Sequence, residues 1–177
     1  MYDVVAIGEL LVDFACRSTD DDGYPVLAAH PGGAPANFLA VLARYGLKTG
    51  LLAKVGNDAF GRLLRRTVER EGIDTAGIVV DDAAFTTLAF VTLDENGERD
   101  FSFARKPGAD MLLRYDELDL SLIDRTRVFH FGSVSMTDEP SRDATRRAAA
   151  YARSRGGLLT YDPNLRIPLW KDLAQAR

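Results

Sequence analysis

The chain contains little cysteine, little histidine and no long apolar run, and each shortage excludes a class of protein. Its single cysteine, Cys16, cannot form a disulfide within the chain, so a disulfide-stapled scaffold is excluded. No stretch approaches the roughly 20 consecutive apolar residues that span a bilayer. The two histidines, His30 and His130, lie far apart without cysteine or acidic ligand spacing around them, so no metal site is expected.

The sequence also lacks an excess of positive charge. Its 177 residues include 22 lysines and arginines and 26 acidic residues, which gives a formal net charge of -4, and the arginines are scattered. We therefore expect a small-molecule partner, with no nucleic acid and no membrane surface. The opening MYDVVAIGE has neither the basic start nor the apolar core of a secretory signal, so we expect a cytoplasmic protein.

Short apolar runs alternate with longer amphipathic ones along the chain. The runs DVVAIG, PANFLAVLARYG, GLLAKVG and DAFGRLLRRTVEREG follow one another, which is typical of βαβ units. The alternation resumes with RVFHFGS, a helix from about Glu139 to Ser154, and GLLTYDPN. We therefore predict an α/β fold in which residues 1–177 belong to one domain, with a mostly parallel sheet and flanking helices.

The first two predicted helices have recognisable faces and ends. In the first, Phe38, Leu42 and Tyr45 share an apolar face, with Leu39 and Val41 nearby. In the second, Asn57 or Asp58 caps the start, and Gly72 ends the helix.

Residues 86–105 interrupt this pattern with two β-rich runs around Asn96-Gly97. This pair tolerates the positive φ angles of a tight turn, so the segment predicts an antiparallel hairpin. Together with extended segments within residues 10–30, the hairpin is expected to form a small sheet that projects from the βαβ body as a lid.

The segment HPGGAPANFLAVLARYG places two glycines, a proline and an asparagine directly before an apolar helix. Gly32 and Gly33 allow a ligand to approach their backbone closely, and Pro35 suits the first helical turn. Asn37 can donate and accept hydrogen bonds beside the positive end of the helix, which suits a neutral polyhydroxyl ligand. A tight strand-to-helix connection explains the glycines equally well, and their spacing is neither the dinucleotide-binding nor the Walker pattern.

Further polar residues are expected where strands end. Asp13, in GELLVDF, is expected at the exit of the first strand, where ligands gather in α/β folds, and its carboxylate suits two sugar hydroxyls. Arg105 ends the second hairpin strand, and Asn164 and Arg166 follow the strand in GLLTYDPNLR. Singly, such an aspartate is explained as a turn or cap residue and such an arginine as a solvated charge. Their common position at strand ends favours one shared binding site.

Four segments together resemble a known family: GELLVDF, GGAPANFLAVLARYGLKTGLLAKVG, FSFARKPGAD and YDPNLRIPLW. They are similar to the N-terminal half of the ribokinase-type (PfkB) carbohydrate kinases, most closely the bacterial fructokinases. The resemblance implies a ribokinase-like, Rossmann-like body with a β-sheet lid, and ATP- and Mg²⁺-dependent phosphorylation of a sugar hydroxyl. Position by position it implies that the sugar is bound by Asp13, Gly32, Gly33, Asn37, Arg105 and Arg166, and that Asn164 lies toward the phosphates.

One motif of that family does not occur in the sequence. Such kinases depend on a Gly-Ala-Gly-Asp segment that supplies the catalytic base and a phosphate-binding helix start. Without a later glycine loop to hold a phosphate, neither Asp13, Asp110 nor Asp162 is expected to replace that base. We therefore expect a truncated fructokinase that lacks the C-terminal half of the fold, carries mainly the sugar site, and does not phosphorylate alone.

Two alternatives remain open at this point. Arg105 and Arg166 suit the carboxylate of a sugar acid, so a 2-keto-3-deoxygluconate kinase is the second candidate. The third, from another class, is a non-catalytic sugar-binding or interaction module. A homodimer formed through the lid is also expected, since exposed strands can pair with those of a second copy.

Overall fold

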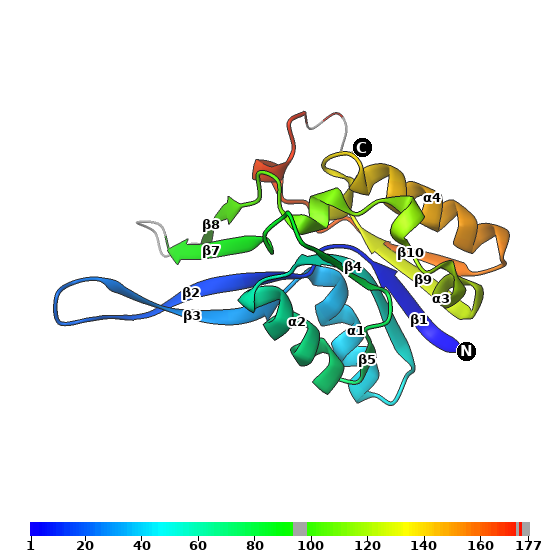
Figure 1. Cartoon of the computed structure of the whole chain (residues 1–177), viewed down its shortest axis with the longest axis horizontal. Helices are drawn as coiled ribbons and strands as arrows, with labels where there is room; N and C mark the ends of the chain where they lie inside the picture. The colour runs from blue at the N-terminus through cyan, green and yellow to red at the C-terminus, as the bar shows by residue number, and fades with distance from the viewer. Residues whose placement is uncertain (94–98, 173, 175–177) are drawn as a thin grey trace.

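The structure, a computed structural model, describes residues 1–93, 99–172 and 174. A sheet forms the body, helices cover both of its faces, and a smaller sheet projects from one end (Figure 1). This is the predicted α/β architecture. The strands of the body are β1 (Tyr2–Ile7), β4 (Thr49–Gly56), β5 (Ile73–Asp74), β6 (Ile78–Asp81), β9 (Thr126–Gly132) and β10 (Leu158–Asp162). The α-helices are α1 (Ala34–Arg44), α2 (Ala59–Arg70), α3 (Leu120–Asp124) and α4 (Ser141–Ser154).

The body sheet has the order β10-β9-β1-β4-β5, with β6 also beside β4, and its strand pairs are parallel. Strand β1 lies in the middle because its residues are apolar on both faces. Val4 and Ala6 pack in the core with α1 and α2, whereas Val5 and Ile7 pack in the core with α3 and α4. The alternation in the sequence thus produces a sheet with two covered faces.

The structure confirms the cap predicted for α2 and alters the apolar face predicted for α1. Asp58 is the cap of α2, and its Oδ1 accepts hydrogen bonds from the backbone N–H groups of Phe60 and Gly61, both at 2.8 Å. The apolar face predicted for α1 is partly confirmed, because Leu39 is fully buried and Leu42 packs against the core, whereas Tyr45 is 81% exposed. The helix turns its smaller residues toward the sheet instead, which allows it to lie close to β1 and β4.

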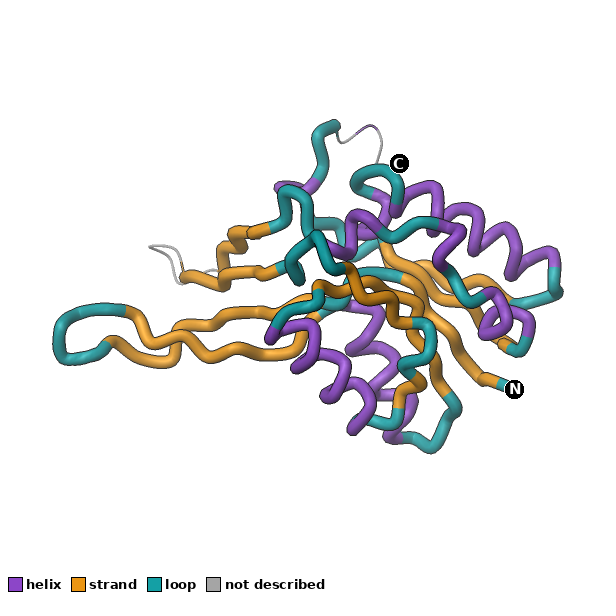
Figure 2. The backbone as a smooth tube through the Cα atoms, viewed as in Figure 1, coloured by secondary structure: helices purple, strands orange, loops and turns teal. Residues whose placement is uncertain are grey.

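The small sheet has the order β3-β2-β7-β8 and extends beyond the body (Figure 2). Its strands are β2 (Leu11–Thr19), β3 (Pro25–Gly32), β7 (Leu88–Leu93) and β8 (Arg99–Ala104). Strands β7 and β8 pair antiparallel, as predicted, although the Asn96-Gly97 turn lies outside the described residues. Phe14 of β2 stacks on Phe90 of β7 and meets Phe60 of α2 edge-on at 5.5 Å, so aromatic packing joins this sheet to the body.

Four short 3₁₀ helices occupy the connections among the described residues, and two of them border the site described below. They are η1 (Ala109–Leu112), η2 (Tyr115–Glu117), η3 (Val134–Met136) and η4 (Ile167–Leu169). None of the helices in the described part of the chain combines the length and apolar character needed to cross a bilayer.

Candidate functional site

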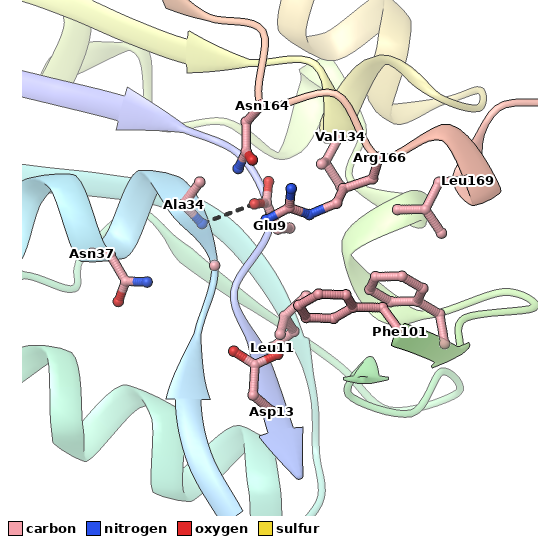
Figure 3. Close-up of a pocket in the computed structure, with 12 residues that line it drawn as sticks. Glu9, Leu11, Asp13, Ala34, Asn37, Phe101, Val134, Asn164, Arg166 and Leu169 are labelled. Carbon is pink, nitrogen blue, oxygen red and sulfur yellow. Dashed lines mark hydrogen bonds between the residues drawn. The ribbon is translucent and has the colours of Figure 1, made fainter. Parts of the chain in front are cut away.

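A cavity of about 170 Å³ opens where the exits of β1 and β10, the start of α1 and the small sheet meet (Figure 3). Pockets for drug-sized ligands enclose roughly 300–1,000 Å³, so this cavity has the scale of a smaller molecule such as a monosaccharide. Its lining comes from segments far apart in the sequence. The lining residues are Glu9, Leu11, Asp13, Gly33, Ala34, Asn37, Phe101, Phe103, Val134, Asn164, Arg166 and Leu169.

Five of the residues singled out in the sequence line this one cavity. They are Asp13, Gly33, Asn37, Asn164 and Arg166. In Figure 3, Asp13 and Asn37 lie across the space from Asn164 and Arg166. The last two follow β10, as predicted, whereas Asn37 lies in the first turn of α1. The structure thus brings these five residues to one cavity, but of the four residues predicted at strand ends only Asn164 and Arg166 line it from a strand end.

Asp13 reaches the cavity from a different element than predicted. Strand β1 ends at Ile7, and Asp13 is the third residue of β2, opposite His30 of β3. Burial raises the pKa of the Asp13 carboxyl, and the positive charges of Arg166 and His30 partly offset this effect. A half-buried carboxyl facing an arginine across a cavity is placed to accept hydrogen bonds from ligand hydroxyls.

Gly32 is not among the residues that line the cavity, so its predicted contact with the ligand stays a prediction. A Cβ atom built on Gly32 would overlap the carboxylate of Asp13. The missing side chain at Gly32 therefore leaves room for Asp13. Gly33 does line the cavity, has a φ angle of 114°, and lies against the carbonyl oxygen of Glu9 so closely that a Cβ atom would overlap it.

We predict that Gly33→Ala lowers the free energy of unfolding by about 3 kcal/mol or more, because it adds both backbone strain and an overlap with main chain. Gly156→Ala is the matched control, since Gly156 also has a positive φ angle, 83°, but a Cβ atom there meets nothing within 4 Å. Gly156→Ala should lower the free energy of unfolding only through backbone strain, by about 1–2 kcal/mol. Urea titration of both variants measures the difference, and equal losses would contradict the close approach at Gly33.

Arg105 does not line the cavity either, although it follows β8 as predicted. Its buried guanidinium donates to Oδ2 of Asp110 from Nε at 2.8 Å and forms an ion pair with it through NH2 at 2.7 Å. NH1 donates to Oγ1 of Thr137 at 2.9 Å, and NH2 donates to the carbonyl of Val134 at 3.2 Å. The guanidinium that was expected to reach the ligand is held in place by the protein itself.

Glu9 is a lining residue that the sequence analysis did not single out. It lies at the exit of β1, where Asp13 was expected, and only 4% of it is exposed. Its Oε1 accepts a hydrogen bond from the backbone N–H of Ala34 at 2.9 Å, as Figure 3 shows. The Gly-Glu pair directly after the apolar run DVVAI was the available signal, by the same strand-exit rule that had been applied to Asp13.

The cavity combines hydrogen-bonding groups with apolar surface. Leu11, Phe101 and Phe103 supply the apolar part, and the Arg166 guanidinium lies 5.4 Å from the centre of the Phe101 ring. Carboxylate, amide and guanidinium groups on opposite sides of the space, together with aromatic rings, suit a ligand with hydroxyl groups and C–H faces. His130 lies outside this lining, packs on Phe38 and shares a hydrogen bond with Thr160, as expected of a core-strand histidine.

Comparison with known proteins gives a family match over the whole chain. The model of the pfkB family carbohydrate kinases matches residues 1–177. Probable fructokinase-3 of Arabidopsis thaliana is 46% identical over 176 residues, which cover 98% of this chain and 51% of that protein.

Solved structures agree. A fructokinase from Xylella fastidiosa superposes with a TM-score of 0.93 at 33% identity, covering 99% of this chain and 56% of that one. The structure of fructokinase with bound ATP from Xylella fastidiosa superposes with a TM-score of 0.92 at 32% identity, covering 99% and 57%. The chain thus spans about half the length of the relatives it matches.

Proposed function

Because the chain belongs to the pfkB family of carbohydrate kinases, whose model matches residues 1–177, we propose that the protein transfers the γ-phosphoryl group of ATP to a hydroxyl group of fructose. The convergence of Asp13, Gly33, Asn37 and Arg166 on one monosaccharide-sized cavity is the observation that carries this proposal. The names of the similar proteins, fructokinases from a plant and a bacterium, support the choice of sugar.

Within this proposal each side chain has a role that its chemistry allows. Asp13 accepts hydrogen bonds from two sugar hydroxyls, while Asn37 donates and accepts beside the positive end of α1. The backbone of Gly33 lies close to the sugar because no side chain intervenes. Arg166 contacts sugar oxygens, and Asn164, in the same loop, lies toward the phosphates of ATP.

Fructose is favoured over a sugar acid because the Arg105 guanidinium is already hydrogen-bonded within the protein. A sugar-acid carboxylate would need a free guanidinium, but Asp110, Thr137 and the Val134 carbonyl occupy that of Arg105. The charged side chains lining the cavity are then Glu9, Asp13 and Arg166, two acids and one base. Such a lining disfavours an additional negative charge, so a 2-keto-3-deoxygluconate kinase becomes the weaker candidate.

The chemistry of transfer needs groups beyond those in this cavity. The family's Gly-Ala-Gly-Asp segment does not occur in these 177 residues, so we propose that this chain alone binds the sugar without phosphorylating it. ATP with Mg²⁺ is the proposed phosphoryl donor. Among the described residues, no three His, Cys, Asp or Glu side chains are grouped as a metal site.

A coupled assay of the full-length gene product with ATP, Mg²⁺ and fructose tests the reaction. We expect turnover with fructose and much weaker turnover with 2-keto-3-deoxygluconate, because Arg105 is occupied and the acids Glu9 and Asp13 line the cavity with Arg166. Calorimetry of the 177-residue chain, with fructose and ATP titrated separately, tests whether this chain alone binds the sugar. Fructose binding with no turnover by the full-length protein would favour the non-catalytic sugar-binding module instead.

We also propose a cytoplasmic homodimer that forms through the small sheet, which would act as the lid over the sugar. Strand β3 lies at an edge of that sheet and exposes Val26 and Leu27, which supports pairing with a second copy. Sedimentation velocity over a range of protein concentrations tests the dimer, and a monomer at every concentration would contradict it.

A further inference from the structure

The start of α1 has no cap from its own segment. The N-cap position is Gly33, which has no side chain to offer, and the first turn contains no acidic residue. Helix starts expose N–H groups that need an acceptor and favour a negative charge nearby. Here the acceptor is the carboxyl of Glu9, from a strand exit far back in the sequence, which receives the Ala34 N–H at 2.9 Å.

The main chain around Glu9 touches the same turn. A Cβ atom on Gly33 would overlap the carbonyl oxygen of Glu9, and a Cβ atom on Gly8 would lie 2.6 Å from Cγ of Pro35. The exit of β1 and the turn that begins α1 are therefore in close contact, through the main chain of Gly33 and the ring of Pro35. This contact places Glu9 where it can influence Gly33 and the first turn, which contains Asn37.

The second carboxyl oxygen of Glu9 is unusual for a buried group. Oε2 is buried and has no hydrogen-bond partner among the described residues. Burial raises the pKa of Glu9 to about 7, and the hydrogen bond from Ala34 partly opposes this rise. Of the nearby charges, Asp110 raises this pKa and Arg105 lowers it.

Other titratable groups face the same region from the elements around it. Asp13 of β2 and Arg166 of the loop after β10 line the cavity with Glu9, and His130 belongs to β9, the strand beside β1. Burial lowers the pKa of His130. A comparison of Glu9 with an uncharged side chain at the same position separates its titration from theirs.

We propose that Glu9 is a positioning residue for the sugar: its charged carboxyl holds the Ala34 N–H and thereby fixes Gly33 and Asn37 in the geometry that binds the ligand. This inference rests on the proposed function, because it assigns Glu9 to the sugar site. A carboxylate accepts a stronger hydrogen bond than a neutral carboxyl group and interacts more favourably with the helix start. Loss of its charge loosens the turn.

Charge at Glu9 has opposite effects on stability and on binding. Because its pKa in the folded protein lies above 4.5, the ordinary value for a glutamate, the folded state holds this proton more tightly than the unfolded chain does. Its contribution to stability is therefore greatest below about pH 4.5 and declines as the pH rises to about 7. Sugar affinity should rise over the upper part of that range, as the carboxylate forms.

Glu9→Gln tests this, since glutamine retains the acceptor and nearly the same volume but cannot carry the charge. At pH 8 we expect the variant to bind fructose roughly tenfold more weakly than the wild type while melting at a higher temperature. At pH 5.5, where the wild-type carboxyl is mostly protonated, both differences should nearly vanish. Glu71→Gln, on the surface beside Arg44, is the matched control and should change neither pH profile.

Backbone amide exchange gives a readout that does not require the sugar. At pH 8 the Ala34 amide should exchange faster in Glu9→Gln than in the wild type, because its acceptor is weaker. Wild-type fructose affinity in the variant at pH 8, or a joint fall of affinity and stability, would overturn the inference. Absence of fructose binding by the wild type would instead contradict the proposed function, and the Ala34 exchange rate would then decide the role of Glu9 alone.

Discussion

Asp13→Asn is expected to weaken fructose binding by roughly 10- to 150-fold, which corresponds to about 1.5–3 kcal/mol for a hydrogen bond to a charged group. The carboxylate can accept hydrogen bonds from two hydroxyls, whereas the asparagine amide offers one acceptor oxygen and places donors where the sugar also donates. Titration calorimetry with fructose measures the change. Because burial raises the pKa of Asp13, removal of its charge should not lower the free energy of unfolding.

The matched control for this variant is Asp116→Asn, an exposed position on η2 that is not part of the cavity lining. It removes the same charge and should leave fructose affinity unchanged. Affinity within twofold of the wild type in Asp13→Asn would contradict the assignment of Asp13 to the sugar. A parallel loss of affinity in both variants would indicate a long-range charge effect instead.

Asp110→Asn is expected to lower the free energy of unfolding by about 3–5 kcal/mol, because it leaves the guanidinium of Arg105 charged and buried without a counter-ion. The side chains of Arg105 and Asp110 are 3% and 2% exposed. Asp110 also accepts a hydrogen bond from Thr87, at the residue before β7, while Arg105 follows β8. The pair therefore ties together both strands of the hairpin where they leave the body, and guanidinium chloride titration measures its loss.

Two comparisons sharpen this prediction. The double variant Arg105→Met with Asp110→Leu removes both charges, and it should recover much of the stability lost in the single variant. Asp116→Asn breaks the solvent-exposed pair with Arg114 and should have little effect. A loss in Asp110→Asn no larger than that in Asp116→Asn would contradict a structural role for the buried pair.

The elements with short-range signals could be predicted from the sequence. The apolar runs of β1, β4, β9 and β10 gave the parallel sheet because strands covered on both faces must be apolar throughout. Asp58 and Gly72 marked the ends of α2 through interactions within a few residues. Asn164 and Arg166 could be placed because they directly follow a recognisable strand.

The errors fall where the outcome depends on contacts between distant segments. The guanidinium of Arg105 is held partly by Asp110, five residues away, but also by Thr137 and the carbonyl of Val134, which come from η3 far along the chain. The role of Gly32 depends on where Asp13 lies on the neighbouring strand. Glu9 is different, because its position directly after the apolar run of β1 was a local signal, and only its hydrogen bond to Ala34, 25 residues further along, depends on the fold.

The parallel pairing of β1 with β9, which places Tyr2 beside Thr126, also has a kinetic consequence. The segment between these two strands must become ordered before their pairing can stabilise the fold. The contact order is therefore high, and we expect refolding to be slow. Glu9 and Arg166 lie near opposite ends of the chain. Both line the cavity only when β10 is paired with β9. A chain in which β10 has not paired with β9 therefore lacks part of the cavity lining, and with it the proposed sugar site.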